Sequence, residues 1–316
     1  RLKDVLIRHQ SRVESNVKNN GISYAITRLN SYYTNRGMFR ELTSGLDYYN
    51  FITDLTQNFD FQKEQIIKNL QTTADLLFMK QNLVAGITCS EDNYNEFQKE
   101  FEGFLANLSD EKVSKNKWAF DFSAKNEGFM SSSMVQYVTK GYDYKKLGYE
   151  WDGKMRVLNQ ILSSDYLQNK IRVMGGAYGG WARISPSGVT YFASYRDPNL
   201  KETIENYDAA PEFLMNFDAD EKEMTRFIIG TISNMDRPTT ASQRGAMAFQ
   251  NHFTKQTKAE MEEERNAVLA TTSRDIQNYA SIIEDVMTQN ILCAYGNDKK
   301  IETHKEIFTE IKPVTQ

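Results

Sequence analysis

The sequence predicts a helix-rich α+β protein of about two domains. Its 316 residues correspond to that number at roughly 150 residues per domain. Hydrophobic residues make up 40% of the chain and charged residues 25%, so it can bury ordinary cores and is not a disordered tail. Only 5 prolines occur beside many Leu, Ile, Lys, Glu and Gln residues, and this composition favours helices.

The first part of the chain is predicted to be mainly helical, because apolar residues recur there at helical spacing with charged residues between them. We expect helices at 2–16, 22–33, 39–55 and 61–79. The apolar, β-prone run Leu83–Cys89 then predicts a short buried strand, in which Cys89 is a buried structural thiol. Ser90 can cap a following helix that runs to about Leu108.

A charged, Ser-rich stretch at 109–117 is the best linker in the chain. From Trp118 onward, strand and helix patterns both occur, so this part is predicted to be α+β. We expect strands at 134–138, 181–184 and 189–195, and helices at 153–172, 199–216, 220–235, 242–253, 259–279 and 281–292. Ser185-Pro186-Ser187-Gly188 joins two of these strands as a hairpin turn by its composition.

Charge, cysteine and histidine content exclude several classes of protein. A formal net charge of −4 argues against binding of nucleic acid through its phosphates. The two cysteines, Cys89 and Cys293, lie far apart without a C-x-x-C motif, which excludes a zinc ribbon and a disulfide framework. The histidines, His9, His252 and His304, have no metal-motif spacing, so only a long-range histidine site stays open.

The sequence contains no targeting or membrane signal. No stretch approaches the roughly 18 apolar residues of a membrane span, and no signal peptide opens the chain, so we expect no membrane partner. Unpaired cysteines and the missing signal favour a reducing interior. We expect the bacterial cytoplasm, or alternatively the interior of an organelle after leader removal. Because the first residue is Arg rather than Met, we also expect a fragment or a processed chain.

A glycine-rich segment, Gly175-Gly176-Ala177-Tyr178-Gly179-Gly180, is the first candidate site. A phosphate cradle needs a strand, then glycines, then a helix, and here a helix precedes and a strand follows. A plain helix-to-strand turn would use one or two glycines for positive φ or close approach. Alternatively, the glycines form an open backbone surface, where the Tyr178 hydroxyl and the Arg172 guanidinium hold a peptide carbonyl or the oxyanion derived from it.

The other candidates have plain structural explanations. The acidic clusters at 218–223 and 262–264 are predicted to be solvated helix faces. His252 is predicted to be a surface or packed histidine on an amphipathic helix. Ser131-Ser132-Ser133 lacks a G-x-S-x-G context, so a serine nucleophile is unsupported.

Two stretches are specific enough to indicate a family. They are Tyr166–Gly179 (YLQNKIRVMGGAYG) and Phe192–Leu200 (FASYRDPNL), the second followed by Glu202, Thr203 and Tyr207. Supporting matches lie at 135–138, 228–232, 265–269 and 271–272. Together they resemble the C-terminal half of presequence proteases, the pitrilysin/insulinase-type zinc metallopeptidases that include falcilysin.

The resemblance implies a fold and an organisation. Such enzymes consist of four related α/β units in two bowl-shaped halves, which enclose a chamber for unfolded peptides. Residues 1–112 would be the mostly helical back part of the third unit, 113–127 a linker and 128–316 the inactive fourth unit, with an antiparallel sheet packed against helices. The third unit would be truncated, which would leave an exposed edge strand.

The resemblance also implies a division of chemical labour. Zinc would bind an H-x-x-E-H motif and a distal Glu in the N-terminal half, and this sequence lacks that motif. The helix at 153–172 would correspond to the zinc-binding helix of a catalytic unit, with 156–160 at the analogous spacing and no good zinc ligand. We therefore expect this segment to bind no metal and to hydrolyse nothing alone.

The resemblance assigns roles to residues of the glycine-rich segment. Tyr178 would donate to the scissile carbonyl and stabilise the oxyanion, acting in trans to the zinc half. Arg172, Gly175, Gly176, Ala177 and Gly179 would bind substrate. The partners would be the N-terminal catalytic half, in the same chain or a separate one, and unfolded peptides. The alternative is a stand-alone inactive peptidase-like binding or partner subunit.

Overall fold

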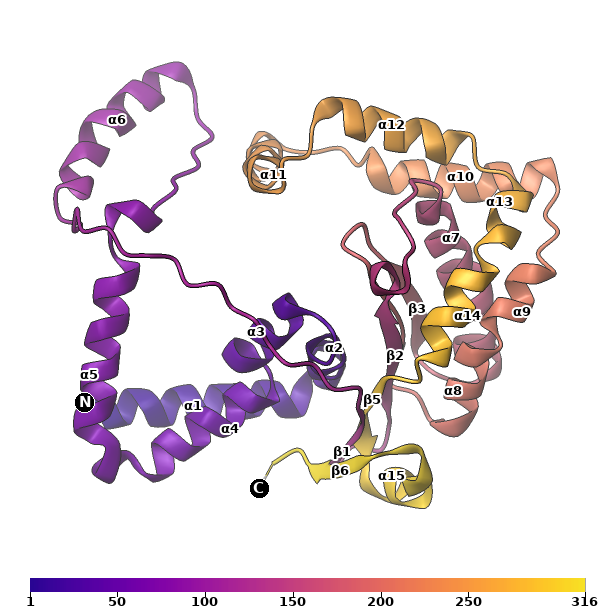
Figure 1. The fold of residues 1–316 in the computed structure, drawn as a ribbon, viewed down its shortest axis with the longest axis horizontal. Coiled ribbons are helices and arrows are strands. Elements are labelled where there is room, and N and C mark those ends of the chain that lie inside the picture. Colours follow the sequence, from indigo (N-terminus) through magenta and orange to yellow (C-terminus); the bar gives the residue numbers. More distant parts are fainter. Residues whose placement is uncertain (316) are drawn as a thin grey trace. The chain divides into compact units, whose positions relative to one another are not determined.

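The computed structural model describes residues 1–315, and it confirms a helix-rich α+β fold (Figure 1). The chain packs into two compact units. The sheet unit comprises Arg1–Thr56, Ala119–Met235 and the chain from Glu262 onward, and the helical unit comprises Gln57–Trp118 and Asp236–Met261. This grouping follows packing. The division into family units at 113–127 concerns the relation of the segments to one another and stays a prediction.

The sheet unit is built on one six-stranded sheet with the strand order β3-β4-β2-β5-β1-β6. Its strands are β1 (Asn126–Ser131), β2 (Tyr137–Asp143), β3 (Gly179–Ile184), β4 (Val189–Tyr195), β5 (Leu292–Asn297) and β6 (Glu310–Pro313). Neighbours from β3 to β5 are antiparallel, as predicted, whereas β1 is parallel to both β5 and β6. The sheet is therefore mixed, and β3 and β6 are its edges.

Helices cover one face of this sheet and enclose the main hydrophobic core (Figure 1). They are α7 (Met155–Ile161), its π-helical continuation η3 (Leu162–Met174), α8 (Lys201–Asp208), α9 (Ala210–Met215), α10 (Glu221–Met235), α13 (Ser273–Asn278) and α14 (Ala280–Thr288). The predicted helix at 153–172 is confirmed, and the residues of it that were expected to point inward are buried. These are Val157, Leu158, Ile161, Leu162 and Leu167.

The helices of the N-terminal segment pack with the opposite face. They are α1 (Leu2–Asn19), α2 (Gly21–Ser31), α3 (Asn35–Ser44) and α4 (Leu46–Gln57). Helix α2 lies against β2 and β5, and its Leu29 is fully buried in a second core. A Cβ atom at Gly21 would lie 2.7 Å from the Tyr137 ring, so glycine permits this close approach. The Tyr295 hydroxyl donates to the Val17 carbonyl at 2.7 Å.

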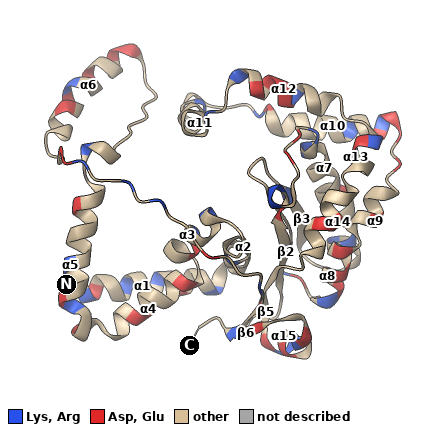
Figure 2. Ribbon diagram, viewed as in Figure 1, with Lys and Arg blue, Asp and Glu red and all other residues tan. Residues whose placement is uncertain are grey.

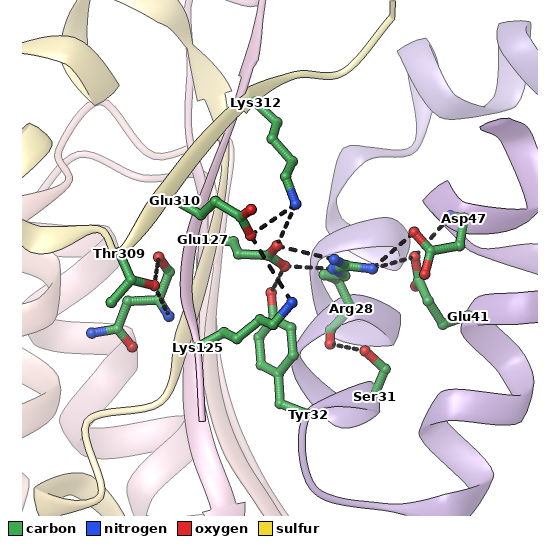
Figure 3. A network of polar contacts seen from close by, with 11 residues as sticks. Arg28, Ser31, Tyr32, Glu41, Asp47, Lys125, Glu127, Thr309, Glu310 and Lys312 are labelled. Atoms are coloured by element: carbon green, nitrogen blue, oxygen red, sulfur yellow. Dashed lines mark hydrogen bonds and ion pairs between the residues drawn. The ribbon is translucent and has the colours of Figure 1, made fainter. Parts of the chain in front are cut away.

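A buried charge network joins α2 to the sheet (Figure 3). Arg28 donates to Glu127 of β1, and its Nη1 reaches Glu41 at 3.2 Å and Asp47 at 3.1 Å. The Tyr32 hydroxyl and Lys312 of β6 also donate to Glu127. Burial alone would raise the pKa of Glu127, but the hydrogen bonds and charge of Arg28 outweigh it and hold that pKa far below its ordinary value.

Helix boundaries depart from the predictions where a side chain starts a new helix. The predicted helix at 259–279 is two helices, α12 (Lys258–Leu269) and α13, because the Thr272 side chain caps the second by accepting from the Asp275 N–H. The predicted helix at 199–216 likewise divides into α8 and α9, with Pro211 in the first turn of α9. The predicted strand at 134–138 begins only at Tyr137, because Gln136 makes an isolated bridge to Asp197. Three short helices, η2 (Tyr144–Leu147), α15 (Asp298–Thr303) and η4 (Lys305–Ile307), complete this unit.

The helical unit contains α5 (Phe59–Leu77), η1 (Lys80–Asn82), α6 (Glu91–Leu105) and α11 (Ala241–Thr254). The strand predicted at 83–89 is wrong, since this segment pairs with no strand in the described part of the chain. It packs instead against α11: a Cβ atom at Gly86 would lie 2.5 Å from the Phe249 ring. Cys89 is exposed, so its assignment as a buried thiol is also wrong. No helix within residues 1–315 is long and apolar enough to span a membrane.

Candidate functional site

The candidate site is the turn where η3 ends and the chain enters the edge strand β3. Backbone hydrogen bonds fix its shape, since the Gly175 N–H donates to the Lys170 carbonyl and the Ala177 N–H to the Ile171 carbonyl. Gly176 has a φ of 78°, which favours glycine. The Asn199 side-chain amide donates to the Gly175 carbonyl at 2.7 Å. We call residues 172–179 the glycine turn.

The glycine turn brings the two predicted functional side chains together. The Arg172 guanidinium carbon lies 5.9 Å from the centre of the Tyr178 ring, and both side chains are exposed, Tyr178 by 67%. The Tyr178 N–H donates to the Tyr195 carbonyl at 3.0 Å, and the two rings meet edge to face. The Tyr178 hydroxyl bonds to no residue within 1–315. The backbone of Tyr178 is thus held, and its hydroxyl faces solvent as a donor.

Structure explains three of the four glycines without any ligand. Gly176 needs its positive φ. A Cβ atom would lie 2.7 Å from the Ile171 carbonyl oxygen at Gly175 and 2.9 Å from the Ile171 side chain at Gly180. Gly179 differs, since a Cβ atom there would meet nothing within 4 Å. The helix-to-strand turn therefore accounts for most of the glycines, and only Gly179 leaves backbone beside open space.

An aromatic row extends the site across the sheet. Tyr178 contacts Tyr195, which contacts Tyr137 with ring centres 5.5 Å apart, and Tyr137 contacts Tyr295. Arg196 has a φ of 50° and places its guanidinium carbon 5.6 Å from the Tyr195 ring centre. The sequence prediction did not name Tyr195 or Arg196, although both lie in the specific stretch Phe192–Leu200 and could have been found there.

The edge strand β3 gives the site an unpaired backbone. β3 pairs with β4 on one side, and no strand among residues 1–315 pairs with its other side. Such an edge offers a row of N–H and C=O groups to an added extended chain. Donors only, a hydroxyl and a guanidinium, stand at its beginning, which suits carbonyl oxygens and oxyanions.

The donor set for zinc was tested on the described residues. No group of three or more His, Cys, Asp or Glu side chains among residues 1–315 could hold a metal ion. The polar residues of α7 serve the fold: Arg156 donates to Glu264 at 3.0 Å, and the Asn159 side chain accepts from the Ile184 N–H at 2.8 Å. The residues of this chain do not fit a zinc centre.

The remaining candidates have the structural roles expected of them. Asp218 and Glu262 lie on exposed surfaces, and Lys and Arg are interspersed with acidic residues along the helices (Figure 2). Glu264 is the exception, because it pairs with Arg156. His252 is exposed on α11, and the Ser131 hydroxyl donates to the Gly296 carbonyl at 3.1 Å.

Comparison with known proteins confirms the resemblance seen in the sequence. The family described as the PreP C-terminal domain matches residues 126–296, and a family described as associated with M16 peptidases of subfamily C matches residues 1–55. Protein HypA of Clostridium perfringens is 35% identical over 314 residues, which cover 99% of this chain and 32% of that protein. Presequence protease 1, chloroplastic/mitochondrial, of Arabidopsis thaliana is 28% identical over 318 residues, which cover 99% of this chain and 29% of that protein.

Solved structures share the fold. Pitrilysin aligns with a TM-score of 0.56 at 12% identity, over 93% of this chain and 31% of that one. The periplasmic protease PqqL from Escherichia coli aligns with a TM-score of 0.53 at 14% identity, over 93% of this chain and 32% of that one. The chain spans about a third of the length of the curated relatives it matches.

Proposed function

On the premise that this chain belongs to the PreP C-terminal domain family of M16 peptidases, we propose that it is the non-catalytic C-terminal part of a zinc metalloendopeptidase for unfolded peptides. In this proposal the zinc site belongs to an N-terminal half, and the chain described here helps to enclose the peptide. It also supplies substrate-binding and oxyanion-stabilising groups to that site. The compartment stays a prediction, because bacterial and organellar relatives both match.

The observation that carries the proposal is the pairing of Arg172 with Tyr178 at a free sheet edge. Both side chains are exposed, and they lie within 5.9 Å of each other. The Tyr178 hydroxyl would donate to the carbonyl oxygen of the scissile bond and strengthen this bond as negative charge develops there. The Arg172 guanidinium would hold a neighbouring backbone carbonyl of the substrate.

The other predicted substrate-binding residues would act differently from one another. The N–H groups of Gly175, Gly176 and Ala177 already donate to carbonyls within the turn, so they would shape it rather than bind substrate. Ala177 is also buried. Gly179 stands beside open space and begins β3, so its backbone is the one of this group that a peptide could approach.

The experiment compares this chain alone with the same chain joined to the N-terminal half that carries H-x-x-E-H. Cleavage of an unfolded, fluorescently quenched peptide is measured with and without added zinc. We expect no cleavage by the chain alone and zinc-dependent cleavage by the joined protein. Robust zinc-dependent cleavage by the chain alone would refute the non-catalytic assignment. Peptide binding without any gain on joining would favour the stand-alone partner subunit.

A further inference from the structure

A cleft in the sheet unit gathers cationic side chains that the proposed function does not use. It has a volume of about 460 Å³ and lies between the α2–α3 segment and the β3–β4 hairpin. Four cations line it: Arg36 and Arg40 of α3, Lys146 of η2 and Arg183 of β3. The lining includes a single carboxylate, that of Asp143. We call this feature the basic cleft.

The positive charge of the basic cleft is not neutralised within the described chain. None of its four cations forms an ion pair with a residue among 1–315. Lys146 lies 4.4 Å from the centre of the Phe122 ring, a contact that leaves its charge uncompensated. The Asp143 carboxylate serves the fold, because its Oδ1 accepts from the Lys145 N–H at 3.0 Å.

This arrangement contrasts with the rest of the sheet unit. Lys140 pairs with Asp208 at 2.6 Å, and Lys154 pairs with Asp275 at 2.7 Å. The whole chain carries a formal net charge of −4, so acidic partners are plentiful. Four cations gathered around one cleft without partners repel one another and produce a locally positive field that attracts an anion (Figure 2).

The walls of the cleft suit a carboxylate. Arginine presents a planar fork that matches the two oxygens of a carboxylate, and three of the four cations are arginines. The hydroxyls of Ser185 and Ser187, which lie 2.7 Å apart, and that of Tyr191 add neutral donors. Tyr191 stands opposite Arg183 in the β3–β4 pairing, so one end of the cleft is part of the edge hairpin.

The cleft also stands at a defined distance from the glycine turn. Arg183 lies on the same edge strand as the residues that follow Tyr178, five positions further along the chain. At about 3.3 Å per residue, an extended segment covers this separation in roughly 17 Å. A peptide that follows β3 from Tyr178 would therefore reach the basic cleft with its fifth residue.

We propose that the basic cleft binds a carboxylate of the substrate peptide, either an Asp or Glu side chain or the C-terminal carboxylate, about five residues from the bond held at Tyr178. This inference rests on the proposed function and deepens it by naming a substrate class. The complete peptidase would prefer peptides with an acidic group at that distance. The cleft would lower KM, because it contacts the peptide away from the reacting bond and acts on ground state and transition state alike.

The test uses the complete peptidase, meaning this chain joined to its zinc-binding half. Two sets of peptides are compared, which differ only by Asp or Asn at the positions four to six residues on either side of the cleaved bond. We expect one Asp position to lower KM about threefold with kcat unchanged, and Arg183→Gln to remove that preference. The double variant Arg36→Gln/Arg183→Gln should raise KM for the acidic peptide about tenfold. Lys222→Gln, an exposed change on α10, is the matched control.

A charge swap makes the test sharper. Arg183→Glu should favour a peptide with Lys at the responsive position over the one with Asp, whereas a general loss of folding would weaken both peptides equally. Equal KM values for Asp and Asn peptides at every position would overturn the proposal. So would inhibition by inorganic phosphate that Arg183→Gln abolishes in the absence of any peptide preference, since the cleft would then bind free anions.

Failure of this inference is distinguishable from failure of the proposed function. If the joined protein cleaves no peptide, the proposed function fails. Binding of the acidic peptide is therefore also measured by fluorescence anisotropy, on the complete protein carrying Tyr178→Phe. Tighter binding of the Asp peptide than of the Asn peptide supports the basic cleft independently of turnover, and equal binding contradicts it.

Discussion

The guanidinium of Arg28 donates to both carboxylate oxygens of Glu127, from Nε at 2.5 Å and from Nη2 at 3.0 Å, although 99 residues separate them. Arg28 lies on α2 and Glu127 on β1, so this pair joins the N-terminal helices to the sheet (Figure 3). Both residues are buried. Because a buried charge without its partner is costly, this contact has a stability consequence that can be measured.

Removal of one partner of this pair should strongly destabilise the chain. We expect Arg28→Met to lower the free energy of unfolding by about 3–5 kcal/mol, because Glu127 then stays buried without its main donor. Urea unfolding followed by circular dichroism measures this change. Arg226→Met, at an exposed arginine on α10, is the matched control and should leave the unfolding midpoint nearly unchanged. Similar midpoints for both variants would contradict the role assigned to the buried pair.

The same network predicts a pH dependence of stability through Glu41. Burial raises the pKa of Glu41 to about 7, although the charge of Arg28 opposes this rise. Because the folded pKa lies above the ordinary value, the stability that Glu41 contributes is complete below about pH 4.5 and is lost as the pH rises towards 7. Glu41→Gln should remove up to about 3 kcal/mol of this fall. Unfolding free energies of both proteins at pH 5 and pH 7.5 measure the difference.

Glu127 acts in the opposite direction and sets the lower limit of that pH window. Its pKa is held below the ordinary value, so its contribution is present above about pH 4.5 and is lost in acid. Measurements above pH 5 therefore isolate Glu41. If Glu41→Gln keeps the full slope between pH 5 and 7.5, the loss of stability comes from another group.

The role proposed for Tyr178 predicts a kinetic effect without a structural one. In the complete peptidase, Tyr178→Phe should lower kcat by about 10²-fold, because one donor to the developing oxyanion is lost. The side chain is exposed and its ring contact with Tyr195 is retained, so the melting temperature should not change. Tyr94→Phe, at another exposed tyrosine, is the control. An unchanged kcat in the Tyr178 variant would reject the oxyanion role.

The two cysteines should differ sharply in reactivity. Cys89 is exposed, whereas Cys293 is fully buried, and burial raises the pKa of its thiol well above the ordinary value. A thiol reagent such as Ellman's reagent should therefore label one thiol in the native chain and both after denaturation. Cys89→Ser should abolish the native reaction. Fast labelling of two thiols in the native protein would show that β5 is accessible, contrary to the fold.

Local patterns predicted what depends on neighbours in sequence. The helix at 153–172 follows from the spacing of its apolar residues, which are buried as expected. Arg172 and Tyr178 are six residues apart, so one turn suffices to bring them together. Such contacts need no knowledge of the remaining chain.

Features that depend on distant segments were wrong or missed. The run Leu83–Cys89 has the apolar, β-prone character of a strand, but no neighbouring strand is available, and it packs on α11 instead. The basic cleft draws on three separate segments around Arg36, Lys146 and Arg183, which no local spacing connects. The parallel pairing of β1 with β5 joins residues that lie 166 positions apart, as in the pair Asn126 and Leu292.

The position of β5 in the sheet sets the order in which the protein can fold during synthesis. β5 lies between β2 and β1, yet it leaves the ribosome long after both. Until residue 297 has emerged, a nascent chain exposes two unpaired strand edges and cannot join its early helices to a finished sheet. Translation therefore leaves an interval in which this chain depends on protection from aggregation, and that interval ends only when its last long strand arrives.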